Sequence, residues 1–253
     1  DQGFVVIGVH TPEFEFEKKR ENVEAAIRQY GIRYPVPQDN DYATWNAYRN
    51  RYWPAKYLVD IEGNVRYFHF GEGKYEETER AIQDLLVETG MAVQVAPTPL
   101  PDETPQMRLS PETYLGTKRM ELYYPRGSLA NGKQTFILDE SATRDTFSLG
   151  GTWTISDESV LSGKNATLIH RFYANKVFLV LRPPQGETGT IKVSIDGKPV
   201  DAQSEGVDIV NGVVAVDSDK LYNLIDLRRE NGEHLLRLDF QTEGIEAFAF
   251  TFG

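Results

Sequence analysis

Few side chains in this sequence have the type and spacing that acid–base, nucleophilic or metal chemistry requires. The four histidines lie far apart, and none has the spacing of a zinc site. They are His10, His69, His170 and His234. The sequence contains no Gly-x-Ser-x-Gly nucleophile elbow and no glycine loop of the kind that binds phosphate. It also has no cysteine, so these residues can form neither a disulfide nor a thiolate nucleophile.

Two groups of acidic residues could hold a structural calcium ion, which needs several hard oxygen ligands. The first group is Asp139 and Glu140, and the second is Asp217 and Asp219. Acidic side chains are also typical of solvated loops, and we favour that interpretation. We therefore expect no catalytic residue, no metal and no cofactor in this chain, with a structural calcium ion as the alternative.

Two aromatic residues, Trp153 and Tyr173, could stack on the faces of sugar rings. Trp153 has the same strand parity as Phe147, Leu149 and Ile155, which indicates a core position. Tyr173 stands at the end of an expected strand, where exposure is more plausible. Ordinary packing is the favoured interpretation for both, and ligand stacking is the alternative.

The pair Trp53-Pro54 is the most informative feature. It ends a helical segment and opens a strand, Ala55–Asp60, after which a turn leads to a second strand, Val65–Phe70. Because proline has no N–H, it must lie at the end or edge of a strand or face another group. The preceding aromatic residue and the helix-to-strand position favour a cis bond, and a trans proline at the start of an edge strand is the alternative.

Length and composition limit the possible functions. A chain of 253 residues with 40% hydrophobic and 26% charged residues can bury one large core or two ordinary ones. The net charge of −11 argues against nucleic acid as a partner. No apolar run approaches the roughly 20 residues of a membrane span. The sequence opens in the middle of an apparent fold, so we expect it to be part of a longer polypeptide.

The first 90 residues alternate strands and helices. Phe4–Val9 is a short apolar run typical of a central strand buried on both faces. Val23, Ala26, Ile27 and Tyr30 predict an amphipathic helix that ends at Gly31. Capping residues at 39–41 precede an aromatic helix that runs from 42 to about 49, and a last helix is expected over 75–89. We expect the strands near 4–9, 54–60 and 64–70 to share one sheet.

This order of elements, with a proline before a strand hairpin, is that of thioredoxin-like domains. Several separate blocks resemble the thioredoxin-like part of DipZ-type proteins, which are relatives of the cytochrome c biogenesis and DsbD-type thiol:disulfide interchange proteins. The blocks are FVVIGVHTPEF at 4–14, YPV at 34–36, DNDYATWNAY at 39–48 and YWPA at 52–55. The resemblance covers all of residues 1–90 and implies a bacterial, extracytoplasmic protein of the periplasm or cell envelope, in which the parent chain is anchored in the membrane.

The resemblance also implies what is missing. In that family a strand and a Cys-x-x-Cys helix precede the position where this sequence begins, and the proline packs against the redox disulfide. Trp53 and Pro54 would then line the redox groove, while this chain alone would be inactive. The implied partners of the parent protein are cysteine-containing protein substrates and a membrane electron donor. A sheet without that strand would leave Phe4–Val9 uncovered, so we expect upstream residues, a symmetry mate or the second domain to fill the gap, upstream residues being favoured.

After residue 90 the sequence no longer alternates strands and helices. Residues 91–111 contain five prolines and predict an extended linker. From 112 to 253 the signals are almost all β, with turns at Asp196-Gly197 and Asn211-Gly212. Strands are expected at 135–138, 146–149, 152–156, 167–173, 176–181, 190–195, 213–216, 221–227, 234–240 and 245–252. This pattern predicts an antiparallel, jelly-roll-like sandwich. In the family the corresponding domain resembles carbohydrate-binding modules.

Three functional hypotheses follow. The favoured one is the soluble extracytoplasmic part of a thiol:disulfide oxidoreductase whose dithiol lies outside this chain. The second is a module that binds a glycan or a cell-wall polymer, with the first domain as a non-catalytic scaffold. The third is an interaction scaffold without either activity.

Overall fold

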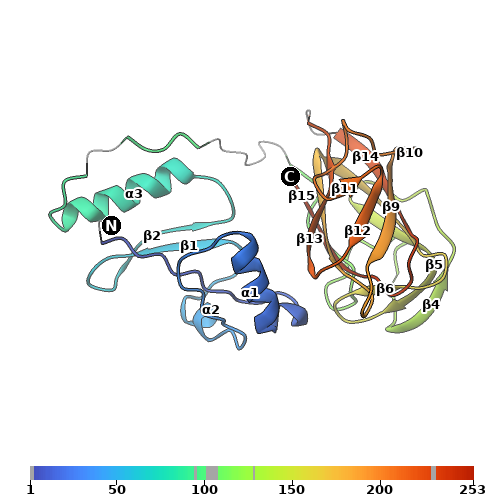
Figure 1. The fold of residues 1–253 in the computed structure, drawn as a ribbon, viewed down its shortest axis with the longest axis horizontal. Coiled ribbons are helices and arrows are strands. Elements are labelled where there is room, and N and C mark those ends of the chain that lie inside the picture. Colours follow the sequence, from blue (N-terminus) through green and yellow to red (C-terminus); the bar gives the residue numbers. More distant parts are fainter. Residues whose placement is uncertain (1–2, 94–95, 101–107, 128, 229–231) are drawn as a thin grey trace. The chain divides into compact units, whose positions relative to one another are not determined.

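The structure, a computed structural model, describes residues 3–93, 96–100, 108–127, 129–228 and 232–253. The chain divides into two compact units, Asp1–Thr104 and Pro105–Gly253, which are taken in turn (Figure 1). The first contains all the helices of the described residues, and the second is a large antiparallel β-structure.

The three α-helices and the two hairpin strands of the first unit follow the expected order, whereas the strand expected at 4–9 does not form (Figure 1). Its helices and strands are the 3-10 helix η1 (Glu15–Lys18), α1 (Arg20–Gln29), α2 (Ala43–Ala47), β1 (Ala55–Val59), β2 (Val65–Phe70) and α3 (Tyr75–Glu88). Helix α1 ends where Gly31 takes a left-handed φ of 61°. Helix α2 is shorter than the expected segment of 42 to about 49, because Arg49 adopts a left-handed φ of 54° that no helix can continue through.

The β1–β2 hairpin is held by its own turn and by α3. The Asp60 carboxylate accepts hydrogen bonds from the backbone N–H groups of Glu62 and Asn64, at 3.0 and 2.8 Å. On one face of the hairpin, the Tyr67 hydroxyl lies 3.2 Å from Thr78 Oγ1 of α3. That face is therefore covered by α3, whereas Phe68 on the other face remains largely exposed.

The expected single sheet is wrong for residues 1–253. β1 and β2 form a two-stranded sheet of their own, and Phe4–Val9 is extended without forming a strand ladder. Gly8 and His10 donate hydrogen bonds to the carbonyls of Pro35 and Pro37, both at 2.9 Å, so a short parallel pairing exists on one side. Among the described residues nothing pairs with the other side, and 71% of Val5 and 60% of Ile7 are exposed. The prediction that this segment is buried on both faces is therefore wrong.

The second unit is built from antiparallel strands. Its strands are β3 (Thr113–Tyr114), β4 (Gly132–Phe136), β5 (Thr146–Ile155), β6 (Val160–Ser162), β7 (Thr167–Ala174), β8 (Lys176–Arg182), β9 (Gly189–Ile195), β10 (Lys198–Pro199), β11 (Ile209–Val210), β12 (Val213–Val216), β13 (Lys220–Asp226), β14 (Gly232–Phe240) and β15 (Glu246–Phe252). Hydrogen-bonded neighbours follow the order β11-β12-β9-β14-β7-β5-β6-β15-β8-β13. Three further strands, β10, β3 and β4, each pair with one strand of this order but lie outside it. Buried side chains from both ends of this order form one core.

Strand β5 joins the two halves of that order. The predicted break between 146–149 and 152–156 is wrong, because β5 runs continuously from Thr146 to Ile155. Its first half pairs with β7 and its second half with β4 and β6. Gly151 takes a φ of 76°, and a Cβ there would lie 2.0 Å from the Asn165 carbonyl oxygen. A glycine is thus required where the strand passes from one sheet to the other.

His170 is a fully buried histidine in this core. Its Nε2 lies 3.0 Å from Thr113 Oγ1, while its Nδ1 has no hydrogen-bond partner among the described residues. The rings of Phe250 and Phe252 lie 5.2 and 5.1 Å away. Burial among these apolar rings lowers the pKa of His170 to about 3.

This pKa predicts an acid-dependent loss of stability. Because the unfolded chain binds the proton at an ordinary pKa of 6.5, His170 has no effect on stability above that pH and destabilises the fold progressively below it. Between pH 7.5 and 5.0, urea unfolding of the wild type should lose about 2 kcal/mol through this group, at about 1.4 kcal/mol per pH unit. His170→Gln should lack this component, and an identical pH dependence in both proteins would contradict the prediction.

Candidate functional site around Trp53 and Pro54

The Trp53-Pro54 peptide bond is cis, as the sequence predicts. Pro54 stands directly before β1, and its carbonyl accepts a hydrogen bond from the Gly71 N–H at 2.8 Å. The loop from Tyr48 to Pro54 therefore connects α2 to the start of the β-hairpin and places the two predicted groove residues at the beginning of β1.

Trp53 is anchored on one face and open on the other. Its indole N–H donates a hydrogen bond to the Thr11 carbonyl at 3.1 Å, and its ring centroid lies 4.2 Å from that of Trp45 in α2. Even so, 45% of Trp53 is exposed. The side chain thus ties the loop before β1 to the end of the Phe4–Val9 segment while presenting a fixed aromatic surface to solvent.

Asp39 positions the Trp45 that supports this ring. Its buried carboxylate accepts hydrogen bonds from the N–H groups of Thr44 and Trp45, at 2.7 and 2.8 Å, and from the Thr11 hydroxyl at 3.1 Å. Burial would raise the pKa of Asp39, but these donors outweigh it and hold the pKa below its ordinary value. The sequence indicated a capping residue at 39–41, whereas the bond to Thr11, 28 positions away, had no local signal.

The backbone edge of β1 that faces away from β2 is free among the described residues. Since Pro54 is bonded to Gly71, the alternation of an antiparallel pair turns the backbone groups of Lys56 and Leu58 toward β2 and those of Ala55 and Tyr57 away from it. By the same alternation, Gly8 and His10 face residues 35–37, so the groups of Ile7 and Val9 point the other way. Both edges can accept an added strand.

Of the two aromatic residues considered for sugar stacking, Trp153 offers no open ring and Tyr173 is partly covered. Trp153 is fully buried, and its indole N–H donates to the Gly150 carbonyl at 2.9 Å. The alternative that Trp153 stacks on a ligand is therefore wrong, because the ring lies in the core, as its strand parity indicates. The guanidinium of Arg144 lies 4.3 Å from the centroid of the Tyr173 ring and occupies one of its faces.

The carboxylates considered for calcium each bond to a protein donor. Asp139 accepts from the Ser141 hydroxyl at 2.6 Å, and Glu140 pairs with Arg237 at 3.0 Å. The hydroxyls of Ser218 and Tyr222 donate to Asp217, and Arg182 contacts Asp219. Across the described ranges, no three His, Cys, Asp or Glu side chains come together as a metal site would require.

Each of the other three histidines lies within hydrogen-bond distance of one oxygen atom. His10 lies 3.0 Å from the Glu17 carbonyl, His69 lies 3.0 Å from the Glu72 carbonyl, and His234 lies 2.7 Å from the Asp196 carboxylate. None of these three imidazoles is hydrogen-bonded to a hydroxyl in the described part of the chain, and the Thr113 hydroxyl beside His170 is buried in the core together with it.

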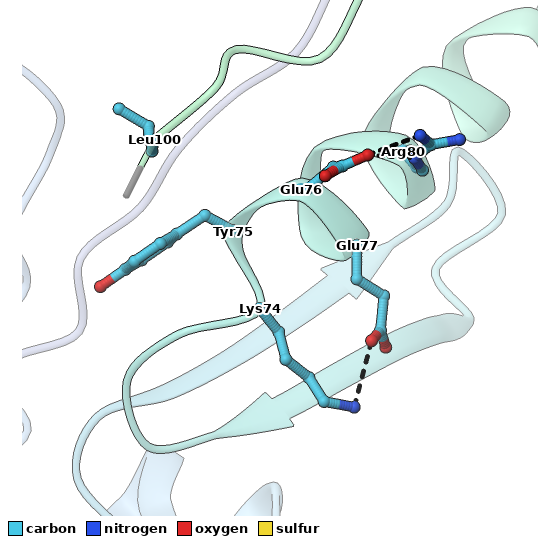
Figure 2. Close-up of a pocket in the computed structure, with 6 residues that line it drawn as sticks. All are labelled: Lys74, Tyr75, Glu76, Glu77, Arg80 and Leu100. Atoms are coloured by element: carbon cyan, nitrogen blue, oxygen red, sulfur yellow. Dashed lines mark hydrogen bonds and ion pairs between the residues drawn. The ribbon is translucent and has the colours of Figure 1, made fainter. Parts of the chain in front are cut away.

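A hollow beside the first turn of α3 is not lined by any imidazole or nucleophilic hydroxyl pair either (Figure 2). It lies between the helix and Leu100, and its charged side chains pair within the helix, Lys74 with Glu77 and Arg80 with Glu76 (Figure 2). Because these charges neutralise one another, the hollow presents no unpaired charge to a ligand.

Comparison with known proteins places the chain in a family. Residues 110–253 match the model of the thioredoxin-like C-terminal domain. The chain belongs to that family. It is also homologous along its whole length to protein DipZ of Mycobacterium bovis and of Mycobacterium tuberculosis, with 38% identity over 258 residues. That match covers 100% of the chain and 34% of each relative, so the chain spans about a third of their length.

Two further similarities cover less of the chain. The thiol-disulfide oxidoreductase YkuV of Bacillus subtilis is 30% identical over 84 residues, which is 33% of this chain and 57% of that protein. Among solved structures, a family two carbohydrate esterase from Clostridium thermocellum in complex with cellohexaose matches 40% of this chain and 29% of its own, with 18% identity and a TM-score of 0.32. No helix in the described ranges has the length and apolar character to cross a membrane.

The position of Asp39 predicts a specific loss of stability. In Asp39→Asn, one carboxylate oxygen, which accepts hydrogen bonds, becomes an amide N–H₂, which cannot accept them. Because three donors point at this group, at least one hydrogen bond to a charged acceptor is lost. We expect urea unfolding at pH 7 to show a loss of about 1.5–3 kcal/mol. Because the pKa is lowered in the fold, the wild-type advantage should be present above the ordinary pKa of 3.8 and disappear as the pH falls through the folded value.

Asp41→Asn is the matched control, because Asp41 is exposed and accepts only a 3.4 Å bond from the Ala43 N–H. It should change stability by less than about 0.5 kcal/mol. Equal effects of the two substitutions would contradict the role assigned to Asp39.

Proposed function

We propose that this chain is the soluble, extracytoplasmic part of a thiol:disulfide oxidoreductase, and that the dithiol belongs to the same parent protein outside residues 1–253. The first unit would be a thioredoxin-like domain without its first strand and Cys-x-x-Cys helix, and residues 91–111 a linker. The second would be a jelly-roll-like sandwich over 112–253. Homology to DipZ along the whole chain supports this proposal, as does similarity to a protein named thiol-disulfide oxidoreductase.

The observation that carries the proposal is the pair of open strand edges in the first unit. Phe4–Val9 pairs on one side only, β1 pairs only with β2 in the described part of the chain, and the Trp53–Thr11 hydrogen bond links the two. One added strand between them would satisfy both backbone edges. The Cys-x-x-Cys helix proposed to accompany that strand would cover apolar side chains such as Val5 and Ile7, each worth about 1.5–3 kcal/mol when fully removed from water.

In this arrangement the chemistry belongs to the dithiol and the positioning belongs to this chain. One thiolate attacks a sulfur of the substrate disulfide and forms a mixed disulfide, while the other substrate sulfur leaves as a thiolate. The second thiol, once deprotonated, attacks the mixed disulfide, so the substrate gains two electrons and the dithiol becomes a disulfide. Trp53 and Pro54 would line the groove in which the substrate cysteine approaches. A membrane electron donor would then reduce the disulfide again.

Activity should follow the dithiol. An insulin-reduction assay of residues 1–253 should match buffer, because no thiolate exists in this chain. The longer soluble region of the parent protein, including its Cys-x-x-Cys segment, should reduce insulin. A version of that region with both cysteines changed to serine serves as the control. Turnover by residues 1–253 alone, or none by the longer region, would contradict the proposal.

A further inference from the structure

The stretch of sequence that contains Trp53 has a charge opposite to that of the whole chain. The chain carries 38 acidic residues and a net charge of −11, yet the 18 residues from Tyr42 to Val59 contain none and include Arg49, Arg51 and Lys56. Lys56 is engaged elsewhere, since its ammonium lies 4.7 Å from the Tyr75 ring centroid and 3.4 Å from the Gly73 carbonyl. Two arginines therefore give the loop its positive charge.

Arg49 and Arg51 are exposed, and their guanidinium groups make no hydrogen bond or ion pair with any described residue. Other arginines of the same unit are paired: Arg66 lies 2.9 Å from Glu88, and Arg80 pairs with Glu76. A guanidinium presents several N–H donors in a geometry that matches a carboxylate. The two free arginines can thus each take a carboxylate from another molecule.

Fixed aromatic rings lie beside these arginines. The Tyr52 ring, 55% of whose residue is exposed, lies 5.2 Å from that of Phe70. The Asn50 side chain ties the loop together, because its Nδ2 donates to the Tyr52 carbonyl at 2.9 Å and its Oδ1 accepts from the Tyr57 hydroxyl at 3.0 Å. Trp53 is held by Thr11 and Trp45, as described above. A partner would therefore meet rings that are already ordered, which lowers the entropy cost of binding.

We propose that the loop Tyr48–Pro54 selects extended substrate segments with acidic residues around the cysteine. Carboxylates of the segment pair with Arg49 and Arg51, and an apolar side chain next to the cysteine packs on Tyr52 and Trp53. This inference rests on the proposed function, since it assigns a substrate class to the same groove. An anionic membrane is the less favoured occupant, because clusters of about 4–8 basic residues are typical of lipid recognition and this loop has two in an acidic protein.

Peptide binding to residues 1–253 tests the inference without any dithiol. The probe is a fluorescein-labelled nonapeptide with a central serine in place of cysteine, flanked by leucine and tyrosine and by four glutamates. Matched peptides carry four glutamines or four lysines. Fluorescence anisotropy should detect the glutamate peptide most strongly and the lysine peptide least, and the affinity for the glutamate peptide should fall as salt is raised from 20 to 300 mM.

The variant R49Q/R51Q should bind the glutamate peptide at least about fivefold more weakly, at about 0.5 kcal/mol for each exposed ion pair. Its affinity for the glutamine peptide should be unchanged. R126Q/R228Q removes the same charge from exposed positions of the second unit and should bind like the wild type.

Equal binding of the three peptides, or equal weakening by both double variants, would overturn the inference. So would binding only to phosphatidylglycerol vesicles, or an effect of R49Q/R51Q on self-association alone. If the longer parent region reduces insulin but the glutamate peptide is not preferred, the inference fails and the proposed function stands. If the peptide is preferred but the longer region is inactive, the proposed function fails, and the loop is a binding site for acidic segments rather than a substrate groove.

Discussion

The first unit depends on one buried carboxylate. Asp39 gathers the N–H groups of Thr44 and Trp45 and the hydroxyl of Thr11, and so joins α2 to the end of the Phe4–Val9 segment. Trp45 then supports Trp53, whose indole N–H returns to the Thr11 carbonyl. A buried charge is tolerated only when such donors satisfy it. The loop before Pro54 therefore has a defined shape although much of it faces solvent.

The two units differ in how completely they bury their apolar side chains. In the second unit, both ends of the strand order contribute to one core, and Trp153, Phe147 and Leu149 are fully inaccessible. In the first unit, Phe4–Val9 and part of the β1–β2 hairpin remain exposed. The proposed added strand gives this difference a physical cause. It also explains why the same unit combines firm anchoring around Trp53 with two unpaired backbone edges.

Local patterns predicted much of this structure. Apolar periodicity placed α1 and α3, alternation placed most strands of the second unit, and parity put Trp153 in the core. Contacts between residues that are distant in the sequence could not be predicted from such local patterns. Gly150-Gly151 resembled a break between strands, whereas the left-handed Gly151 lets β5 continue from one sheet to the other. The apolar run at 4–9 indicated a buried strand, but burial depends on neighbours, and among the described residues only 35–38 pair beside it. Likewise, the sequence alone could not show that the side chains of Arg49 and Arg51 are unpaired.

The most direct test of this account is amide hydrogen exchange along the two open edges, compared between residues 1–253 and the longer region that the proposed function assigns to a parent protein. Gly8 and His10 are internal references, because their N–H groups already bond to Pro35 and Pro37. The account predicts that the amides of Ile7, Val9, Ala55 and Tyr57 exchange fast in residues 1–253. In the longer region they should become at least about a hundredfold slower, as in a paired strand. Equally fast exchange at these four amides in both proteins would contradict it.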